Sequence, residues 1–356
     1  VRSTVSRSGV SSVDELLDII GGFELSRVFP VDARHEERTV RDGLNCWYVV
    51  RYGNDCSVED VTRRFSALGE VQKVDVNRTI KRAYNRKAQP LSEKAYRAMS
   101  NNTRVLQNTF NDELSHYQWN IENDGTMAEL CGKTIAGADV QVVDAWKRTT
   151  GDSSVVVAVL DEGIFVEHPD LASNIWYNAN ANSDNNGYED DYYGYNFVNE
   201  TGKITWNGYY DSGHGTHVAG TIAAVNNNGI GVCGIAGGSG NKDGVKLMSV
   251  QIFNGDDGAT TSNLVRAFQY AADNGAHISQ NSWGYLSAET EDANYWELGP
   301  ANDRDYKYQL KSEAGAIDYF VANGGGDKSV IDGGLVIFAA GNDSAPLPGY
   351  PAAYEP

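Results

Sequence analysis

The feature that most constrains the fold is an uninterrupted apolar run at residues 155–160, Val-Val-Val-Ala-Val-Leu, which ends on Asp161. A strand without polar alternation has to be covered on both faces, as strands of parallel sheets are. Further strand-like runs lie at 245–253, 277–283 and 335–340, and a helix-like segment at 262–275 lies between the first two of them. This alternation predicts an α/β fold with a mostly parallel, doubly covered sheet.

A small α+β module is predicted ahead of this sheet, in residues 1–80. A Ser N-cap, early acids and a terminal Gly predict a helix at 12–21. Ser57, followed by Asp60 three residues later, predicts a second helix that ends at Gly69. Apolar runs predict strands at 23–31, 46–52 and 70–80.

Residues 81–110 carry basic residues and little apolar patterning, which predicts an exposed tether, a preferred site for cutting. We interpret the junction at 81–111 as a processing segment; an ordinary linker is the alternative. The net charge is +4 over residues 1–110 and −23 over 111–356. Net charges of opposite sign favour two modules that associate with each other. The simpler interpretation is that the acidic surface only keeps a secreted protein soluble.

Composition argues against two function classes. The sequence holds no apolar run of about 18 residues, so we expect no membrane span. Its one basic region is only mildly basic, so we expect no nucleic-acid partner. Because residues 1–7 contain no apolar segment, we interpret the N-terminus as a processed end that has lost an export signal. We expect a secreted, cell-surface or periplasmic protein of bacterial origin.

Two residues form the predicted chemical centre. Asp161 follows a buried strand, at the sheet edge where α/β proteins build their sites. His214 follows Asp211-Ser-Gly and opens the small-residue segment His-Gly-Thr-His-Val-Ala-Gly, which predicts a helix close to the sheet. A His at such a helix start can accept a hydroxyl proton while a carboxylate orients its other nitrogen.

Residues from about 111 to 355 resemble the subtilisin-like serine proteases. The matching motifs, in family order, are Asp161-Glu-Gly-Ile with His168-Pro-Asp-Leu, His214-Gly-Thr-His-Val-Ala-Gly-Thr, Asn281-Ser-Trp-Gly284 and Ala339-Ala-Gly-Asn342. The resemblance implies a secreted endopeptidase that cleaves protein or peptide substrates with an Asp-His-Ser triad. It also implies that residues 1–80 are the enzyme's own propeptide, 81–110 the processing segment and 111–356 the N-terminal part of the catalytic domain.

The resemblance assigns roles residue by residue. Asp161 matches the triad acid, His214 the general base, and Asn342 the amide donor of the oxyanion hole. The backbone that pairs with substrate as an added strand matches Ser282, Trp283 and Gly284, and the P1-pocket lining matches Ala339, Ala340 and Gly341. Asp256 and Asp257 match positions near the family's substrate-binding edge, and their negative charge favours substrates with basic side chains.

A structural Ca²⁺ is also implied by the resemblance, since oxygen-only ligands suit this ion. The matching positions are Asp112, Asp170, the carbonyls of Val225, Ile230 and Val232, and the Asn227 side chain. The loop is one residue longer than in some relatives, which leaves the choice between Asn227 and Asn228 open. A second acidic loop, residues 184–191, is either another ion site or a solvated turn.

The family's nucleophile lies some tens of residues after Asn342, whereas this sequence reaches Pro356 first. Ser344 is too close to Asn342 and lacks the Gly-Thr-Ser turn. We therefore expect the catalytic sheet to be incomplete at its C-terminal end. We also expect the chain alone to be inactive, with the catalytic Ser supplied by a segment missing from it, either a separate C-terminal fragment or a continuation of the same chain. The alternative is a catalytically silent homologue that acts as a binding or structural module.

Other residues leave alternatives open. His168, His214, His217 and Asp161 have ligand chemistry for a metal hydrolase, but no metal-ligand spacing motif supports it. Among the cysteines, Cys46, Cys56, Cys131 and Cys233, no Cys-x-x-Cys pair occurs, and Cys46 and Cys56 form either a local disulfide or free thiols. An insertion between Gly284 and Gly334 either shapes specificity or is a surface elaboration.

Overall fold

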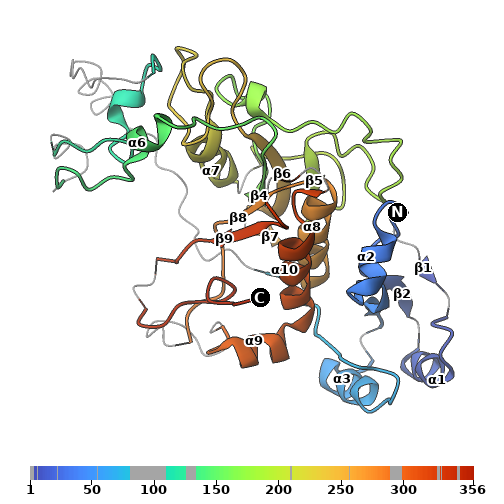
Figure 1. Cartoon of the computed structure of the whole chain (residues 1–356). Helices are drawn as coiled ribbons and strands as arrows, with labels where there is room; N and C mark the ends of the chain where they lie inside the picture. Colours follow the sequence, from blue (N-terminus) through green and yellow to red (C-terminus); the bar gives the residue numbers. More distant parts are fainter. Residues whose placement is uncertain are drawn as a thin grey trace.

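The computed structural model describes residues 4, 5, 7–21, 23–53, 55–80, 110–125, 134–208, 211–255, 257–288, 299–326, 329, 331–342 and 345–356. The expected linker, except Phe110, lies outside these residues, as do Cys131, Asp256 and Ser344. The described residues form a small N-terminal module with its own sheet and a larger α/β unit (Figure 1).

The α/β unit is built on a six-stranded sheet with the order β5-β6-β4-β8-β9 and β7 paired to β6. The strands are β4 (Val156–Glu162), β5 (Gly194–Asn196), β6 (Lys246–Asn254), β7 (Asp257–Gly258), β8 (Ile278–Asn281) and β9 (Leu335–Phe338). All pairs are parallel except β6 with β7. The expected mostly parallel α/β sheet is confirmed; the short strands β5 and β7 were not predicted.

Helices cover both faces of β4, as its apolar run requires. Val157 and Val159 pack with Ala219 of α7 (His214–Ala223). The alternate residues Ala158 and Leu160 belong to the core formed with α8 (Thr261–Asp273) and α10 (Lys311–Asn323). Figure 1 shows α8 and α10 side by side, on the opposite side of the sheet from α7. Because strand side chains alternate between faces, one strand joins the two cores.

The insertion between β8 and β9 is part of the core. It contributes α9 (Asp303–Gln309) and α10, and Ile317 and Phe320 of α10 are buried in the main hydrophobic cluster. The buried Glu313 accepts hydrogen bonds from the hydroxyls of Tyr285 (2.7 Å) and Tyr306 (2.8 Å). Burial raises the pKa of Glu313 to about 7. The insertion is therefore more than a surface elaboration.

The N-terminal module is a three-stranded antiparallel sheet with helices. Its elements are β1 (Thr4–Val5), α1 (Ser11–Ile20), β2 (Glu24–Arg27), α2 (Glu36–Arg41), β3 (Tyr48–Arg51) and α3 (Val58–Ser66). Leu17 of α1 and Phe65 of α3 share one buried cluster with Leu25 of β2. The expected N-cap is confirmed, since Ser57 Oγ accepts a hydrogen bond from the Asp60 amide at 3.1 Å.

One expectation for this module was wrong. Residues 70–80, predicted as a strand, do not join its sheet; they make only an isolated antiparallel bridge, Thr79 with Thr260. Their backbone instead bonds to the α/β unit, with Ile80 N donating to Ala259 O (2.9 Å) and Thr261 N donating to Arg78 O (2.7 Å). Of the two alternatives left open for Cys46 and Cys56, a local disulfide or free thiols, the structure shows free thiols.

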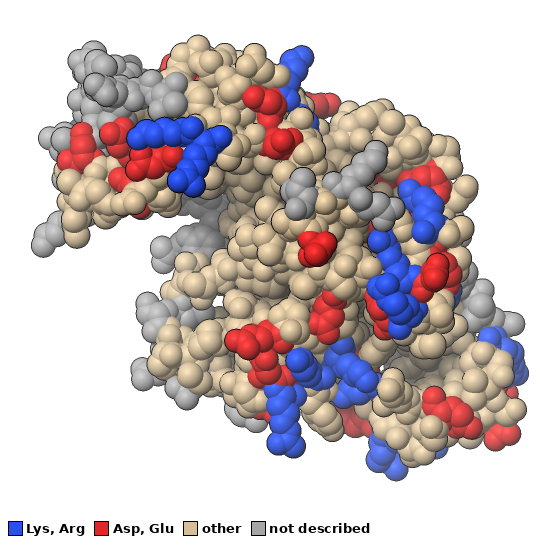
Figure 2. All heavy atoms as spheres, in the orientation of Figure 1, with Lys and Arg blue, Asp and Glu red and all other residues tan. Residues whose placement is uncertain are grey.

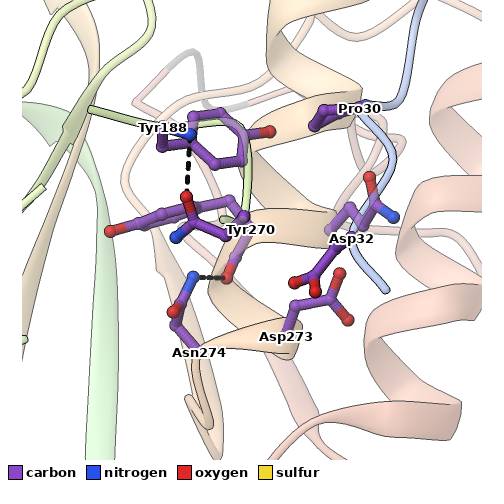
Figure 3. Close-up of a pocket in the computed structure, with 8 residues that line it drawn as sticks. Pro30, Asp32, Tyr188, Tyr270, Asp273 and Asn274 are labelled. Carbon is purple, nitrogen blue, oxygen red and sulfur yellow. Dashed lines mark hydrogen bonds between the residues drawn. The ribbon is translucent and has the colours of Figure 1, made fainter. Parts of the chain in front are cut away.

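The module docks on the ends of α8 and α10 through α2, a helix that sequence reading missed. Arg38 forms an ion pair with Asp273 of α8 (3.0 Å), and Tyr319 of α10 donates to the same carboxylate (2.7 Å). Burial raises the pKa of Asp273 to about 7. A small pocket at this junction brings Asp32 of the module close to Asp273, with Tyr188 and Tyr270 on its other side (Figure 3).

The charge difference between the modules does not produce a large single-sign surface on the face seen in Figure 2. There, Lys and Arg side chains are interspersed with Asp and Glu. None of the described helices is long and apolar enough to cross a membrane.

Candidate active site

Asp161 and His214 come together where β4 ends and α7 begins. Asp161 is the sixth residue of β4 and is buried, with 2% of its surface exposed. His214 is the first residue of α7, and its Nδ1 lies 2.8 Å from Asp161 Oδ1. An ionised carboxylate only accepts hydrogen bonds, so this contact assigns the proton to Nδ1 and makes Nε2 the accepting nitrogen of the ring. The imidazole is about one third exposed (34%) and can therefore meet a second molecule.

Gly215 allows this close approach, and Gly163 allows the backbone at Thr205 to pack against the end of β4. A Cβ on Gly215 would lie 2.1 Å from the carbonyl oxygen of Glu162, and one on Gly163 would lie 2.0 Å from that of Thr205. The first turn of α7 is also tied to the loop after β4, because Thr216 Oγ1 accepts a hydrogen bond from Phe165 N at 2.9 Å. The position of His214 is thus set by backbone contact as well as by Asp161.

The segment after β8 presents an open main chain beside this pair. Trp283 is buried and packs edge-on against Phe338 of β9, with ring centres 5.3 Å apart, which fixes the path of the segment. Within the described part of the chain, the backbone groups of Ser282, Trp283 and Gly284 make no hydrogen bond. The next amide, of Tyr285, is already taken by Tyr350 O at 2.7 Å.

The residues after β9 end at the same edge of the sheet, because β4, β8 and β9 are parallel neighbours. Ala339 N donates to Asn281 O at 2.9 Å, which holds the start of this segment against the end of β8. Ala340 and Asn342 are exposed, and Gly341 has a φ of 86°, a conformation that favours glycine. The structure thus places Asn342 on the side of the sheet where Asp161 lies.

Two of the residues proposed for calcium, Asp112 and Asp170, contact the same loop, residues 227–232. Both carboxylates are buried: Asp112 accepts from the amides of Asn227 (2.7 Å) and Asn228 (3.0 Å), and Asp170 accepts from that of Val232 (3.0 Å). The side-chain amide nearest the carboxylates belongs to Asn228, which donates to Asp170 at 2.8 Å.

The other loop residues differ in their contacts. The Asn227 side chain donates instead to Ser239 O. Val225 N donates to Asp170 O (2.8 Å), and Ile230 N donates to Asn228 Oδ1 (2.8 Å). Burial, aided by the charge of Asp112, raises the pKa of Asp170. Two buried carboxylates with excess negative charge, in a loop rich in carbonyl oxygens, fit a hard cation.

The alternative ligand sets find less support. Across the described segments, no three His, Cys, Asp or Glu side chains gather in an arrangement that could hold a metal. His217 is exposed, and His168 Nδ1 accepts a hydrogen bond from Asp170 N. In the acidic loop, Asp191 is fully buried and accepts from Asn178, Asn186 and Tyr270. Asn185, Glu189 and Asp190 are exposed, so the loop is solvated only in part.

The sequence reading gave no role to Glu162, although it stands in the first motif. Its carboxylate is buried and accepts hydrogen bonds from Ser212 and from the His214 amide. The only sequence signal for a role of Glu162 was its position directly after Asp161, an acid at the end of a buried strand.

The close contact of Gly215 gives a testable prediction. Gly215→Ala would push α7 away from β4, separate His214 from Asp161 and cost on the order of 3 kcal/mol of stability. Gly220→Ala is the matched control in the same helix, because a Cβ there meets nothing within 4 Å; we expect it to be neutral or stabilising by up to about 1 kcal/mol. Thermal unfolding followed by circular dichroism distinguishes the two, and equal melting temperatures would contradict the role of Gly215.

Comparison with known proteins agrees with this geometry. The model of the subtilase family matches residues 152–355. Subtilisin-like protease 1 of Plasmodium berghei is 31% identical over 209 residues, covering 55% of this chain and 31% of the relative. The halolysin-like extracellular serine protease Nep of Natrialba magadii is 31% identical over 173 residues, covering 49% of this chain and 28% of the relative. The chain thus spans about a third of the length of these relatives.

A solved structure supports the fold over nearly the whole chain. Fervidolysin from Fervidobacterium pennivorans, a keratinolytic enzyme related to subtilisin, superposes with a TM-score of 0.51 at 18% identity, covering 97% of this chain and 40% of that one. The family match extends over more than half of the sequence and includes Asp161, His214 and Asn342. The chain therefore belongs to the subtilase family of serine proteases.

Proposed function

We propose that the protein is an endopeptidase in which Asp161 and His214 are two members of an Asp-His-Ser triad. The observation that carries this proposal is the 2.8 Å contact between His214 Nδ1 and Asp161 Oδ1. With its proton fixed on Nδ1, the imidazole accepts the Ser hydroxyl proton at Nε2 as the nucleophile attacks the peptide carbonyl. Asp161 stabilises the imidazolium that forms, and the same proton is then given to the leaving amine.

Substrate binding is proposed for the two segments beside this pair. A peptide that adds as a strand would use the backbone groups of residues 282–284, so that main-chain hydrogen bonds supply affinity. Ala339, Ala340 and Gly341 would line the pocket for the side chain before the scissile bond. Asn342 would donate its side-chain amide to the oxyanion, an interaction of about 3 to 4 kcal/mol in comparable enzymes.

The nucleophile is proposed to come from a segment outside these 356 residues. The state of β9 supports this idea: it pairs only with β8 among the described strands, and Leu335 and Ile337 are 53% and 46% exposed. Strands of parallel sheets are normally covered on both faces, so an exposed apolar edge strand calls for a further element.

The proposed activity is tested by hydrolysis of a denatured protein such as casein by the protein that carries this chain. We expect His214→Ala to lower kcat by about 10⁴-fold or more, since the base is lost. His217→Ala is the matched control, an exposed His one turn further along α7, and is expected to keep wild-type activity. A folded wild-type protein without activity would instead support the catalytically silent homologue.

We propose that residues 1–80 act as a propeptide that covers the substrate edge. Residues 78–80 pair antiparallel with 259–261, which places Ile80 beside the residue that follows β7. The neighbouring loop is tied to the active-site turn, because Asp211 accepts a hydrogen bond from Gly255 N at 2.8 Å. Asp211 is three residues before His214, so the module reaches, at Ile80, a region that is hydrogen-bonded to the catalytic turn. This contact supports a role of the module in obstructing a substrate.

The propeptide proposal predicts that residues 1–110, added in trans to the separated protease, inhibit hydrolysis. Arg38→Ala should weaken this inhibition by about 10- to 100-fold, because it leaves the buried Asp273 without its cation. Arg63→Ala is the control, an Arg of the same module that is 74% exposed and forms an ion pair with Asp60 of its own helix. A fragment that neither inhibits nor assists folding of the protease would contradict the proposal.

We further propose that Ca²⁺ binds at Asp112 and Asp170, with Asn228 as the side-chain amide ligand or Asn227 in its place. Val225, Ile230 and Val232 would add carbonyl oxygens. When bound, the ion neutralises the two buried carboxylates and stabilises the loop at 225–232. Support comes from the burial of both acids and the raised pKa of Asp170.

Removal of calcium gives the test. Excess EGTA should lower the melting temperature of the wild-type chain by several degrees, because a ligand that binds only the folded state stabilises it. In Asp170→Asn this shift should be largely lost, whereas Glu113→Gln, an exposed neighbour of Asp112, should keep it. An unchanged melting temperature of the wild type in EGTA would count decisively against the ion.

The protein is proposed to act outside the cell. One of the relatives is described as an extracellular protease, which supports a secreted or cell-surface location. Fractionation of the source organism, with immunodetection of the protein, tests this.

A further inference from the structure

Glu162 occupies an unusual position for a fully buried acid. It is the last residue of β4, and its carboxylate lies at the start of α7. Glu162 Oε2 accepts hydrogen bonds from the Ser212 hydroxyl (3.0 Å), the Ser212 amide (3.2 Å) and the His214 amide (3.0 Å). Several donors directed at one carboxyl group favour its ionised form.

The beginning of α7 explains why such a carboxylate is needed there. The N-cap residue is Gly213, with a φ of 74°, and it has no side chain that could accept the first amides of the helix. Ser212 Oγ also accepts from His214 N, but at 3.3 Å. The negative charge lies at the positive end of the helix dipole, where anions are stabilised. Glu162 therefore supplies, from the neighbouring strand, the cap that Gly213 lacks.

We propose that Glu162 is a positioning residue for His214: it caps the helix that carries the base and adds a second fixed negative charge behind the Asp161–His214 pair. This inference rests on the proposed proteolytic function. Consecutive residues of one strand thus hold the same histidine, Asp161 through its ring nitrogen and Glu162 through its backbone amide. Glu162 itself does not contact the reacting atoms.

The charge has a measurable consequence for His214. A nearby carboxylate favours the imidazolium form, so its removal should shift the titration of the imidazole to lower pH. Among the described residues, Asp161, Asp211 and His217 are the other charged or titratable groups on this turn and the elements that carry it. Asp211 accepts backbone hydrogen bonds from Gly208 and Gly255, and His217 is exposed one turn along α7. None of them changes when Glu162 is replaced.

The experiment compares Glu162→Gln with wild type by NMR titration of the His214 ring protons in the whole chain. Gln keeps the size and an acceptor oxygen but removes the charge. We expect the His214 midpoint to fall by about half a unit to one pH unit. Glu167→Gln is the matched control, an exposed acid in the loop that follows β4, and should leave the midpoint in place. An unchanged midpoint in folded Glu162→Gln, or an equal shift in Glu167→Gln, would overturn the proposal.

A second variant separates position from charge and covers the case in which Glu162→Gln does not fold. Glu162→Asp keeps the charge on a shorter side chain, so the midpoint should stay close to wild type. Its kcat in the protein that carries this chain should fall about tenfold with little change in KM, because the base is displaced. Wild-type kcat in Glu162→Asp would contradict the positioning role.

The two arms also distinguish this inference from the proposed function. If the wild-type protein hydrolyses nothing, the proteolytic function fails while the titration still reports whether Glu162 acts on His214. If the wild type is active and both Glu162 variants behave like it, only the positioning role is lost.

Discussion

The contact between the end of β4 and the first turn of α7 is the constraint on which the rest of the site depends. Gly215 brings the helix within van der Waals distance of the Glu162 backbone, where a side chain would not fit. Only at this separation can Asp161, on a buried strand, reach the His214 ring at 2.8 Å. The strand cannot move to compensate, because its alternate residues are packed into two different cores.

The same strand order gathers the remaining site residues at one edge. Asp161, the open segment after β8 and the Ala339–Asn342 segment all follow parallel neighbours, so they end on the same side of the sheet. Trp283 and Phe338 pack against each other and fix the two later segments relative to one another. The N-terminal module meets this architecture at α8 and α10, where buried acids such as Asp273 receive its basic side chains.

The sequence predicted the centre of the fold better than its periphery. Long apolar runs and the motifs around Asp161 and His214 are local signals, and the structure bears out the strands and helix that carry them. The stretch 70–80 failed because an alternating pattern indicates an extended chain without saying which sheet it will join. Helix α2 was missed because its sequence, Glu-Glu-Arg-Thr-Val-Arg, has almost no apolar periodicity.

The spacing of residues in the sequence does not predict the direction in which a side chain points. Asn227 and Asn228 are adjacent, and only the loop geometry directs one amide to Asp170 and the other to Ser239. Glu162 shows the same limit, because its task depends on a glycine N-cap in another element, fifty-one residues further along the chain. Such relations arise from packing between elements and leave no periodic signal.

The most direct test of the central claim is covalent labelling by a fluorophosphonate of the protein that carries this chain, with the labelled residue located by mass spectrometry. The reagent reacts with a Ser only when a base activates that Ser. Labelling therefore reports whether the Asp161–His214 pair acts as the base. The account predicts one labelled Ser, and loss of the label when Asp161 is replaced by Asn. A folded protein that takes up no label, or that is labelled equally without the Asp161 carboxylate, would contradict it.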